Sequence, residues 1–143
     1  MTDVDYVFHE AAQAGVRSSI ENPYKPHDVN ATGTLILLEA ARDSDVKKII
    51  YASSSSVYGK VRYLPFDESH PTQPVSPYGV SKLAAEHYCR VYQDIYGIRT
   101  ISLRYFTVYG PRMRPDLAIS IFSQAAANGN PITIFGDGKK TRD

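Results

Sequence analysis

The chain has 143 residues, of which 43% are hydrophobic and 22% charged, and its formal net charge is +1. These values fit one globular domain with a substantial core, and they give no electrostatic reason to expect a nucleic-acid or membrane partner. A single cysteine, Cys89, and four histidines without ligand spacing predict neither a disulfide framework nor a metal site, so the default location is a reducing cytoplasm.

Residues 4–9 are rich in β-branched and aromatic side chains and predict a short strand. The small residues Ala11 and Ala12 follow it, where they would let a flat ligand approach the backbone, although a tightly packed turn explains them equally well. After Pro26 we expect a helix of about fifteen residues that ends near Asp43, with Gly33 as a weak point.

A second apolar run, residues 49–52, leads directly into four serines, Ser53 to Ser56. Serine runs usually indicate linkers. This one is short and follows a predicted strand, so we interpret it as hydroxyl groups presented at the strand's carboxyl end. Residues 60–73 then form a long, proline-containing loop, and loops of that length in compact domains are often functional.

Ser76 and Pro77 predict the start of a helix that runs to about Tyr96, because serine caps free N–H groups and proline suits the first helical position. Tyr78 and Lys82 are four residues apart and therefore share one helical face. A phenol with an ordinary pKa of ~10 beside an ammonium can serve as a base near neutral pH, and one such cation supplies ~1–3 pKa units. An exposed structural pair is the alternative interpretation of this short motif.

The same helix contains an apolar stripe that we expect to pack against the core: Val80, Ala84, His87, Tyr88, Val91 and Ile95. Tyr78 and Lys82 lie off this stripe. We therefore expect them to face away from the core.

A strand over residues 98–106, a helix over 116–128 and a last strand over 132–135 complete an alternation of strands and helices. That alternation predicts an α/β fold, a partial Rossmann-like, doubly wound parallel sheet with flanking helices. Ligands bind beyond the carboxyl ends of such strands. The alanines, the serines and Phe106–Thr107 all fall at those ends.

Together these motifs resemble the extended short-chain dehydrogenase/reductases that act on nucleotide sugars, in particular the nucleotide-sugar 4-epimerases. The resemblance rests on residues 9–12, Asn30 before 32–34, the serines up to Gly59, residues 76–79 with Lys82, and 103–106. It covers the central part of the family's NAD-binding domain. The opening glycine-rich turn and most of the C-terminal sugar-binding part are absent from residues 1–143, so we expect a single domain truncated at both ends.

The resemblance implies roles for individual residues. Tyr78 would be the catalytic base and acid, Lys82 would lower its pKa and hold the nicotinamide ribose, and Ser54 would bind the reacting hydroxyl. NAD would be the cofactor, a UDP-sugar the substrate, and a homodimer would form through the helix that bears Tyr78. The implied NAD-site residues are Ala11, Ala12, Gln13, Asn30, Ser53, Tyr78, Lys82 and Phe106.

The branch of the family follows from one position. In the family's dehydratases and glucuronate decarboxylases, a glutamate precedes the Val-Tyr-Gly motif, whereas here Ser55 and Ser56 stand there. A hydroxyl cannot act as that carboxylate base, so epimerisation at C4 through a 4-keto intermediate is favoured.

The run from Thr107 to Asp116 resembles UDP-glucuronate 4-epimerases. It implies that Arg114, Thr107, Ser55 and Ser56 surround the sugar carboxylate, with Arg17 at the mouth and Arg142 on the diphosphate. An arginine fork suits a carboxylate, although a solvated loop charge or a diphosphate contact explains Arg114 as well. A UDP-glucose/UDP-galactose 4-epimerase is the second interpretation, and a catalytically inactive fragment of such an enzyme is the third.

Overall fold

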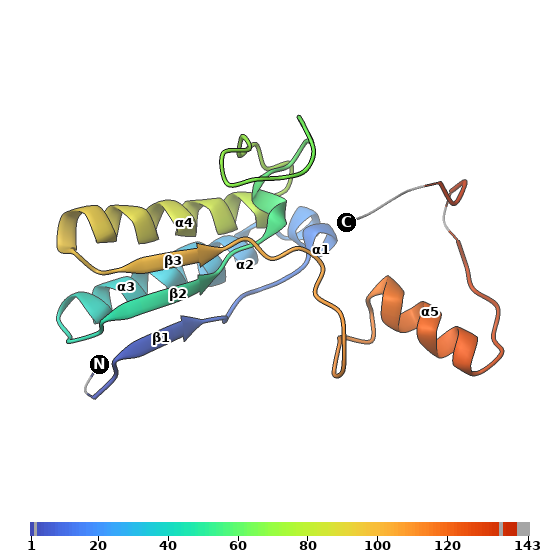
Figure 1. Ribbon diagram of the computed structural model, residues 1–143, viewed down its shortest axis with the longest axis horizontal. Coiled ribbons are helices and arrows are strands. Elements are labelled where there is room, and N and C mark those ends of the chain that lie inside the picture. Colours follow the sequence, from blue (N-terminus) through green and yellow to red (C-terminus); the bar gives the residue numbers. More distant parts are fainter. Residues whose placement is uncertain (2, 135, 140–143) are drawn as a thin grey trace. The chain divides into compact units, whose positions relative to one another are not determined.

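A computed structural model describes residues 1, 3–134 and 136–139. They divide into two compact units, residues 1–105 and 106–143. The first unit holds the sheet and most of the helices (Figure 1).

The sheet has three parallel strands in the order β1 (Tyr6–His9), β2 (Lys48–Ala52) and β3 (Thr100–Leu103). Val7 lies opposite Ile49, which in turn lies opposite Thr100. The carboxyl ends of the three strands lie at the same edge of the sheet, because all three run in one direction. The parallel α/β class expected from the sequence is confirmed.

The first helical region consists of α1 (Val16–Glu21), α2 (Tyr24–Pro26), the π-helical segment η1 (His27–Thr32) and α3 (Gly33–Arg42). The expected helix end near Asp43 is confirmed, since Asp43 is the residue at the C-cap of α3. The helix changes from π to α geometry at Gly33, the position that weakened the sequence pattern.

Helix α4 (Pro77–Tyr96) has the bounds expected from its capping residues. The Ser76 hydroxyl accepts a hydrogen bond from the Gly79 N–H at 3.1 Å, and Gly97 ends the helix with φ of 73°. A left-handed residue there is best supplied by glycine, which has no Cβ to strain.

The buried face of α4 is not the one that the apolar stripe predicted. Val80, Val91 and Ile95 are exposed, whereas Lys82 is only 2% exposed. The inward face instead carries small or polar side chains: Gly79, Ser81, Lys82, Ala85, Cys89 and Tyr92. The prediction that Lys82 points away from the core is therefore wrong.

The core lies between β2 and the helices α3 and α4. Ile49 and Tyr51 of β2 point to the same side and are fully buried against Leu38, Ala85 and Cys89. On the other side of the sheet, Phe8 of β1 is 69% exposed. The helices of the first unit thus pack on the sheet face that bears Tyr51.

The loop of residues 60–73 is built around His70, whose side chain is buried. Its Nδ1–H donates to the Pro71 carbonyl at 3.1 Å, and its Nε2 accepts from the Arg62 N–H at 3.1 Å. The rings of Tyr63 and Phe66 lie with their centroids 4.7 Å from the imidazole. The loop is therefore an ordered structure with its own small core.

The second unit contains α5 (Ala118–Ala127), slightly shorter than the expected helix over 116–128. The expected strand over 132–135 is not formed at residues 132–134, and residue 135 lies outside the described part. Across the described residues, no helix is both long and apolar enough to span a membrane.

Candidate functional site

The serines that follow β2 form a tight turn. Ser54 caps the short 3-10 helix η2 (Ser55–Val57), and its hydroxyl accepts from the Ser56 N–H at 3.2 Å. The Ser55 N–H donates to the carbonyl of Tyr105, just after β3, at 2.8 Å. The backbone of this serine turn, residues 53–56, is thereby fixed to the next strand's end.

Lys82 of α4 contacts the residue that directly precedes this turn. Its ammonium donates to the Ala52 carbonyl at 2.7 Å and lies 4.9 Å from the centroid of the Tyr51 ring. Burial disfavours the charged ammonium and lowers the pKa of Lys82 to about 8. The lysine is thus held at the carboxyl end of β2 with an ammonium that loses its proton more readily than an exposed one.

Tyr78 lies one helical turn before Lys82 and is half-buried. Its neighbour Gly79 packs so closely on the serine turn that an added Cβ would lie 2.6 Å from the Ser56 carbonyl oxygen. The first turn of α4 and the serine turn are therefore in direct contact. The structure brings Tyr78, Lys82 and the serines into one region, as the sequence motifs predicted.

Asn30 is buried and forms hydrogen bonds with two other segments of the site. Its amide donates to the Ser81 hydroxyl at 2.9 Å and to the Gln13 carbonyl at 3.2 Å, and its oxygen accepts from the Gln13 N–H at 2.8 Å. Ser81 donates in turn to the Tyr78 carbonyl at 2.8 Å. Asn30 therefore connects the segment after β1 to the first turn of α4.

His9 and Thr34 extend the hydrogen-bond network of Asn30. The Thr34 hydroxyl donates to the Asn30 carbonyl at 2.6 Å, so it accepts from His9 Nε2, which lies 2.9 Å away. Burial, and to a smaller extent the charge of Lys82, lowers the pKa of His9. Thr34 requires a donor at Nε2, which the Nε2–H tautomer of a neutral His9 supplies.

The segment that follows β1 contains three of the predicted NAD-site residues. Ala11 and Ala12 are exposed beyond the carboxyl end of β1, and Gln13 is held by Asn30. Small side chains leave the backbone accessible there, while Tyr78 and Lys82 lie past the end of the neighbouring strand. These residues lie at the carboxyl-terminal edge of the sheet, where the sequence predicted an NAD site.

The predicted substrate residues are divided among different parts of the chain. Arg17 is exposed on α1, whereas Thr107 and Arg114 belong to the second unit, as does Phe106, which was predicted for the NAD site. The Arg114 guanidinium lies 3.3 Å from the Asp116 carboxylate in its own loop. Arg142 lies outside the described residues.

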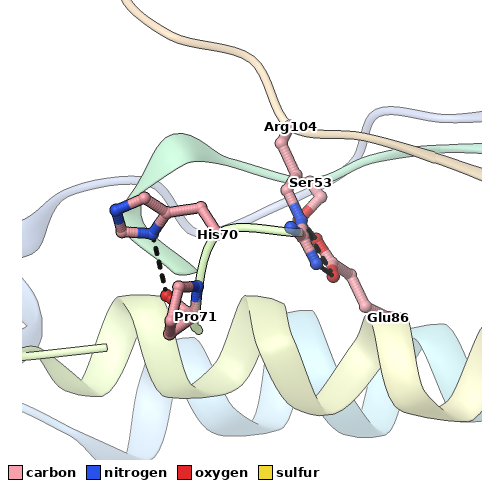
Figure 2. A network of polar contacts seen from close by, with 5 residues as sticks. All are labelled: Ser53, His70, Pro71, Glu86 and Arg104. Atoms are coloured by element: carbon pink, nitrogen blue, oxygen red, sulfur yellow. Dashed lines mark hydrogen bonds and ion pairs between the residues drawn. The ribbon is translucent and has the colours of Figure 1, made fainter. Parts of the chain in front are cut away.

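Sequence reasoning missed the residue pair that connects the strand ends to α4. Glu86 forms an ion pair with Arg104 at 2.9 Å and accepts from the Ser53 hydroxyl (Figure 2). The spacing of four residues from Lys82 is the signal that could have found Glu86, since it places both on one face. Arg104 directly follows the observed strand β3, but the sequence predicted a strand over residues 98–106, which placed Arg104 inside it.

Comparisons with known proteins agree with this geometry. A family model described as "NAD dependent epimerase/dehydratase family" matches residues 1–143. A UDP-glucuronate 4-epimerase from Thermodesulfobacterium geofontis is 46% identical, with 98% of this chain and 43% of the relative covered. The chain thus spans about half the length of the curated relatives it matches.

Two solved structures are similar in both sequence and shape. UDP-glucuronic acid 4-epimerase from Bacillus cereus, in complex with UDP-glucuronic acid and NAD, is 45% identical with a TM-score of 0.89, and 99% of this chain and 45% of that chain are covered. UDP-glucose 4-epimerase from Thermotoga maritima, with UDP-glucose, is 39% identical with a TM-score of 0.92, and 97% and 47% are covered. With its Rossmann-type sheet and the Tyr78–Lys82 helix against the serine turn, this chain belongs to the NAD-dependent epimerase/dehydratase family.

Proposed function

We propose that the protein containing this chain interconverts a UDP-sugar and its C4 epimer through a 4-keto intermediate. The observation that carries the proposal is the contact of α4 with the end of β2 and the serine turn. Gly79, next to Tyr78, packs against Ser56, and Lys82 binds the Ala52 carbonyl. NAD, held by Lys82, Tyr78 and the segment 11–13, would supply a reversible hydride acceptor. Tyr78 would take the proton of the C4 hydroxyl and return it, while Ser54 would orient that hydroxyl.

UDP-glucuronate is the substrate that we favour. Ser55 and Ser56 stand where dehydration or decarboxylation would need a carboxylate base, and Arg17 and Arg114 supply exposed guanidinium groups suited to a sugar carboxylate. A relative named as a UDP-glucuronate 4-epimerase, which is 46% identical and of which this chain covers 43%, supports this choice.

UDP-glucose is the second candidate, and one observation favours it. The Arg114 guanidinium already has a carboxylate partner in Asp116, and both side chains are more than half exposed. An arginine paired in this way is an ordinary surface residue as well as a potential ligand.

Incubation of the full gene product with NAD and each UDP-sugar, followed by chromatography of the products, tests both candidates. We expect UDP-galacturonate to form from UDP-glucuronate. Conversion of UDP-glucose alone would contradict the carboxylate assignment, and conversion of neither sugar would contradict the proposed function.

The third interpretation, an inactive fragment, applies to residues 1–143 by themselves. Among the described strands, β1 pairs on one side only, and the sequence has no glycine-rich dinucleotide turn. Retention of NAD by the purified 143-residue chain, measured by absorbance and mass spectrometry, would contradict this interpretation.

The exposed apolar side of α4 supports a homodimer through this helix, which we also propose. Val80 belongs both to the exposed stripe and to an apolar groove of about 720 Å³ near the helix start. The groove is lined by Pro23, Tyr24, His27, Pro74, Val75, Ser76, Pro77 and Val80. A second copy of the chain would cover both surfaces at once.

We also propose that the protein is located in the cytoplasm. The thiol of Cys89 is buried and forms no disulfide, which suits a reducing compartment.

A further inference from the structure

Glu86 is a nearly buried carboxylate on the inward side of α4, one helical turn after Lys82. Its side chain is 10% exposed. The Arg104 guanidinium approaches it as a fork, with Nη2 2.9 Å from Oε2 and Nε 3.1 Å from Oε1. The Ser53 hydroxyl donates to the same Oε1. Figure 2 shows Ser53 and Arg104 converging on Glu86 above the helix.

Each partner of Glu86 adjoins one end of the serine turn. Ser53 is the first residue of that turn and directly precedes Ser54. Arg104 precedes Tyr105, whose carbonyl accepts from the Ser55 N–H at 2.8 Å. The carboxylate therefore holds the turn from both sides of Ser54.

Lys82 supplies a second attachment between the same elements. Its ammonium binds the Ala52 carbonyl, and Glu86 binds the next residue, Ser53. Lys82 and Glu86 lie on successive turns of α4 and bind the successive residues Ala52 and Ser53. Together the two contacts fix the position of α4 along its axis, and its rotation about that axis, relative to the end of β2.

Stability alone is a weak explanation for this arrangement. A buried ion pair is often no more stabilising than apolar residues of the same volume, because desolvation offsets the attraction. What the forked, three-partner geometry does provide is a defined position for each group. Both carboxylate oxygens of Glu86 already accept hydrogen bonds, from Ser53 and from Arg104.

We propose that Glu86 is a positioning residue that holds the serine turn in register with Tyr78 and Lys82. This inference rests on the proposed epimerisation for its kinetic consequence. Its structural consequence, a fixed serine turn, does not depend on which reaction the protein catalyses.

The test compares Glu86→Gln with Asp94→Asn in the full gene product. Gln keeps the size of the side chain but loses the charge that engages Arg104. Asp94 is the matched control, because it pairs with Arg90 on the same helix at 3.8 Å and is 62% exposed. We expect Glu86→Gln to lower kcat about 10- to 100-fold with KM within about threefold, since misplacement of ~1 Å costs up to ~100-fold. Asp94→Asn should leave both unchanged.

Hydrogen exchange of the same variants gives a readout without turnover. Peptides covering residues 53–58 should exchange at least about tenfold faster in Glu86→Gln, while peptides covering β1 keep their protection. Unchanged exchange and an unchanged kcat would overturn the inference. If the wild-type protein converts no UDP-sugar, the proposed function fails and the exchange result alone decides the role of Glu86.

Ser53→Ala keeps the proposal testable if Glu86→Gln does not fold. It removes one attachment and leaves the ion pair with Arg104. We expect a smaller loss of kcat, about three- to tenfold, and no added loss when Glu86→Gln is combined with it. A wild-type kcat in Ser53→Ala, or fully additive losses in the double variant, would contradict positioning through this contact.

Discussion

The two faces of α4 differ in composition and in what they contact. The inward face carries Ser81, Lys82 and Cys89 and packs on β2 and η1, whereas the outward face carries Val80, Val91 and Ile95 and contacts no core. Polar groups lie inside because each has a partner there: Asn30 for Ser81 and the Ala52 carbonyl for Lys82. The comparison teaches that a helix at a functional site can bury its polar side chains and leave its apolar side chains exposed for contact with another surface.

The largest effect is expected at Tyr78, where the inward face meets the serine turn. Tyr78→Phe removes only the phenolic oxygen, so the fold should be retained while kcat falls by about 10²- to 10⁴-fold, the usual contribution of a general acid–base. Product chromatography and circular dichroism of the full protein check this. Near-wild-type turnover would remove Tyr78 from the mechanism.

The second prediction concerns how the buried charge of Lys82 on the inward face affects the free energy of unfolding. Its pKa is lowered by burial to about 8, so between pH 8 and 10.5 the unfolded chain binds a proton that the folded chain has released. Stability therefore rises with pH across that window, by up to about 3 kcal/mol.

Lys82→Met should abolish this rise, because methionine does not titrate. The measurement is the free energy of unfolding of the cofactor-free protein in urea at several pH values from 7 to 10.5. Parallel curves for wild type and variant would show that the ammonium is not desolvated in the fold.

Gly79 tests the close contact between the inward face and the serine turn. A Cβ there would lie 2.6 Å from the Ser56 carbonyl oxygen, so Gly79→Ala should destabilise the fold by about 1–3 kcal/mol. Gly33→Ala is the control, since its Cβ would meet nothing closer than 3.8 Å and its φ of −60° suits alanine. That control should stabilise the fold by about 0.5–1 kcal/mol. Equal effects of the two substitutions in thermal unfolding would contradict the contact.

The outward face is tested by Val91→Asp, which places a charge in the exposed stripe. Val91 is 45% exposed, so the folded monomer should change in stability by about 0.5 kcal/mol or less. The dimer should dissociate with a Kd at least about tenfold higher, as measured by analytical ultracentrifugation. Val61→Asp, in the 60–73 loop, is the matched control at 56% exposure. A protein that is monomeric before any substitution would contradict the proposed dimer.

Much of the site could be predicted because its parts lie at the ends of elements. Ser76 and Pro77 mark the start of α4, and the serine run follows an apolar strand, so their positions depend on neighbours within a few residues. The contacts of Glu86 with Ser53 and Arg104 could not be predicted in this way. They join residues 33 and 18 positions apart, and the pairing depends on how the strands and α4 pack.

By itself, the sequence determined the order of the three strands with the helices α3 and α4, the bounds of α4 and the motifs at the strand ends, because these follow from local backbone preferences. It did not predict the short helices α1 and α2. Only the tertiary structure decided which face of α4 is buried. Periodicity locates an apolar stripe but does not say whether its partner is the same chain's core. Buried partners for Lys82, Glu86 and Ser81 exist only once the sheet has formed, and they reverse the assignment that hydrophobicity favours.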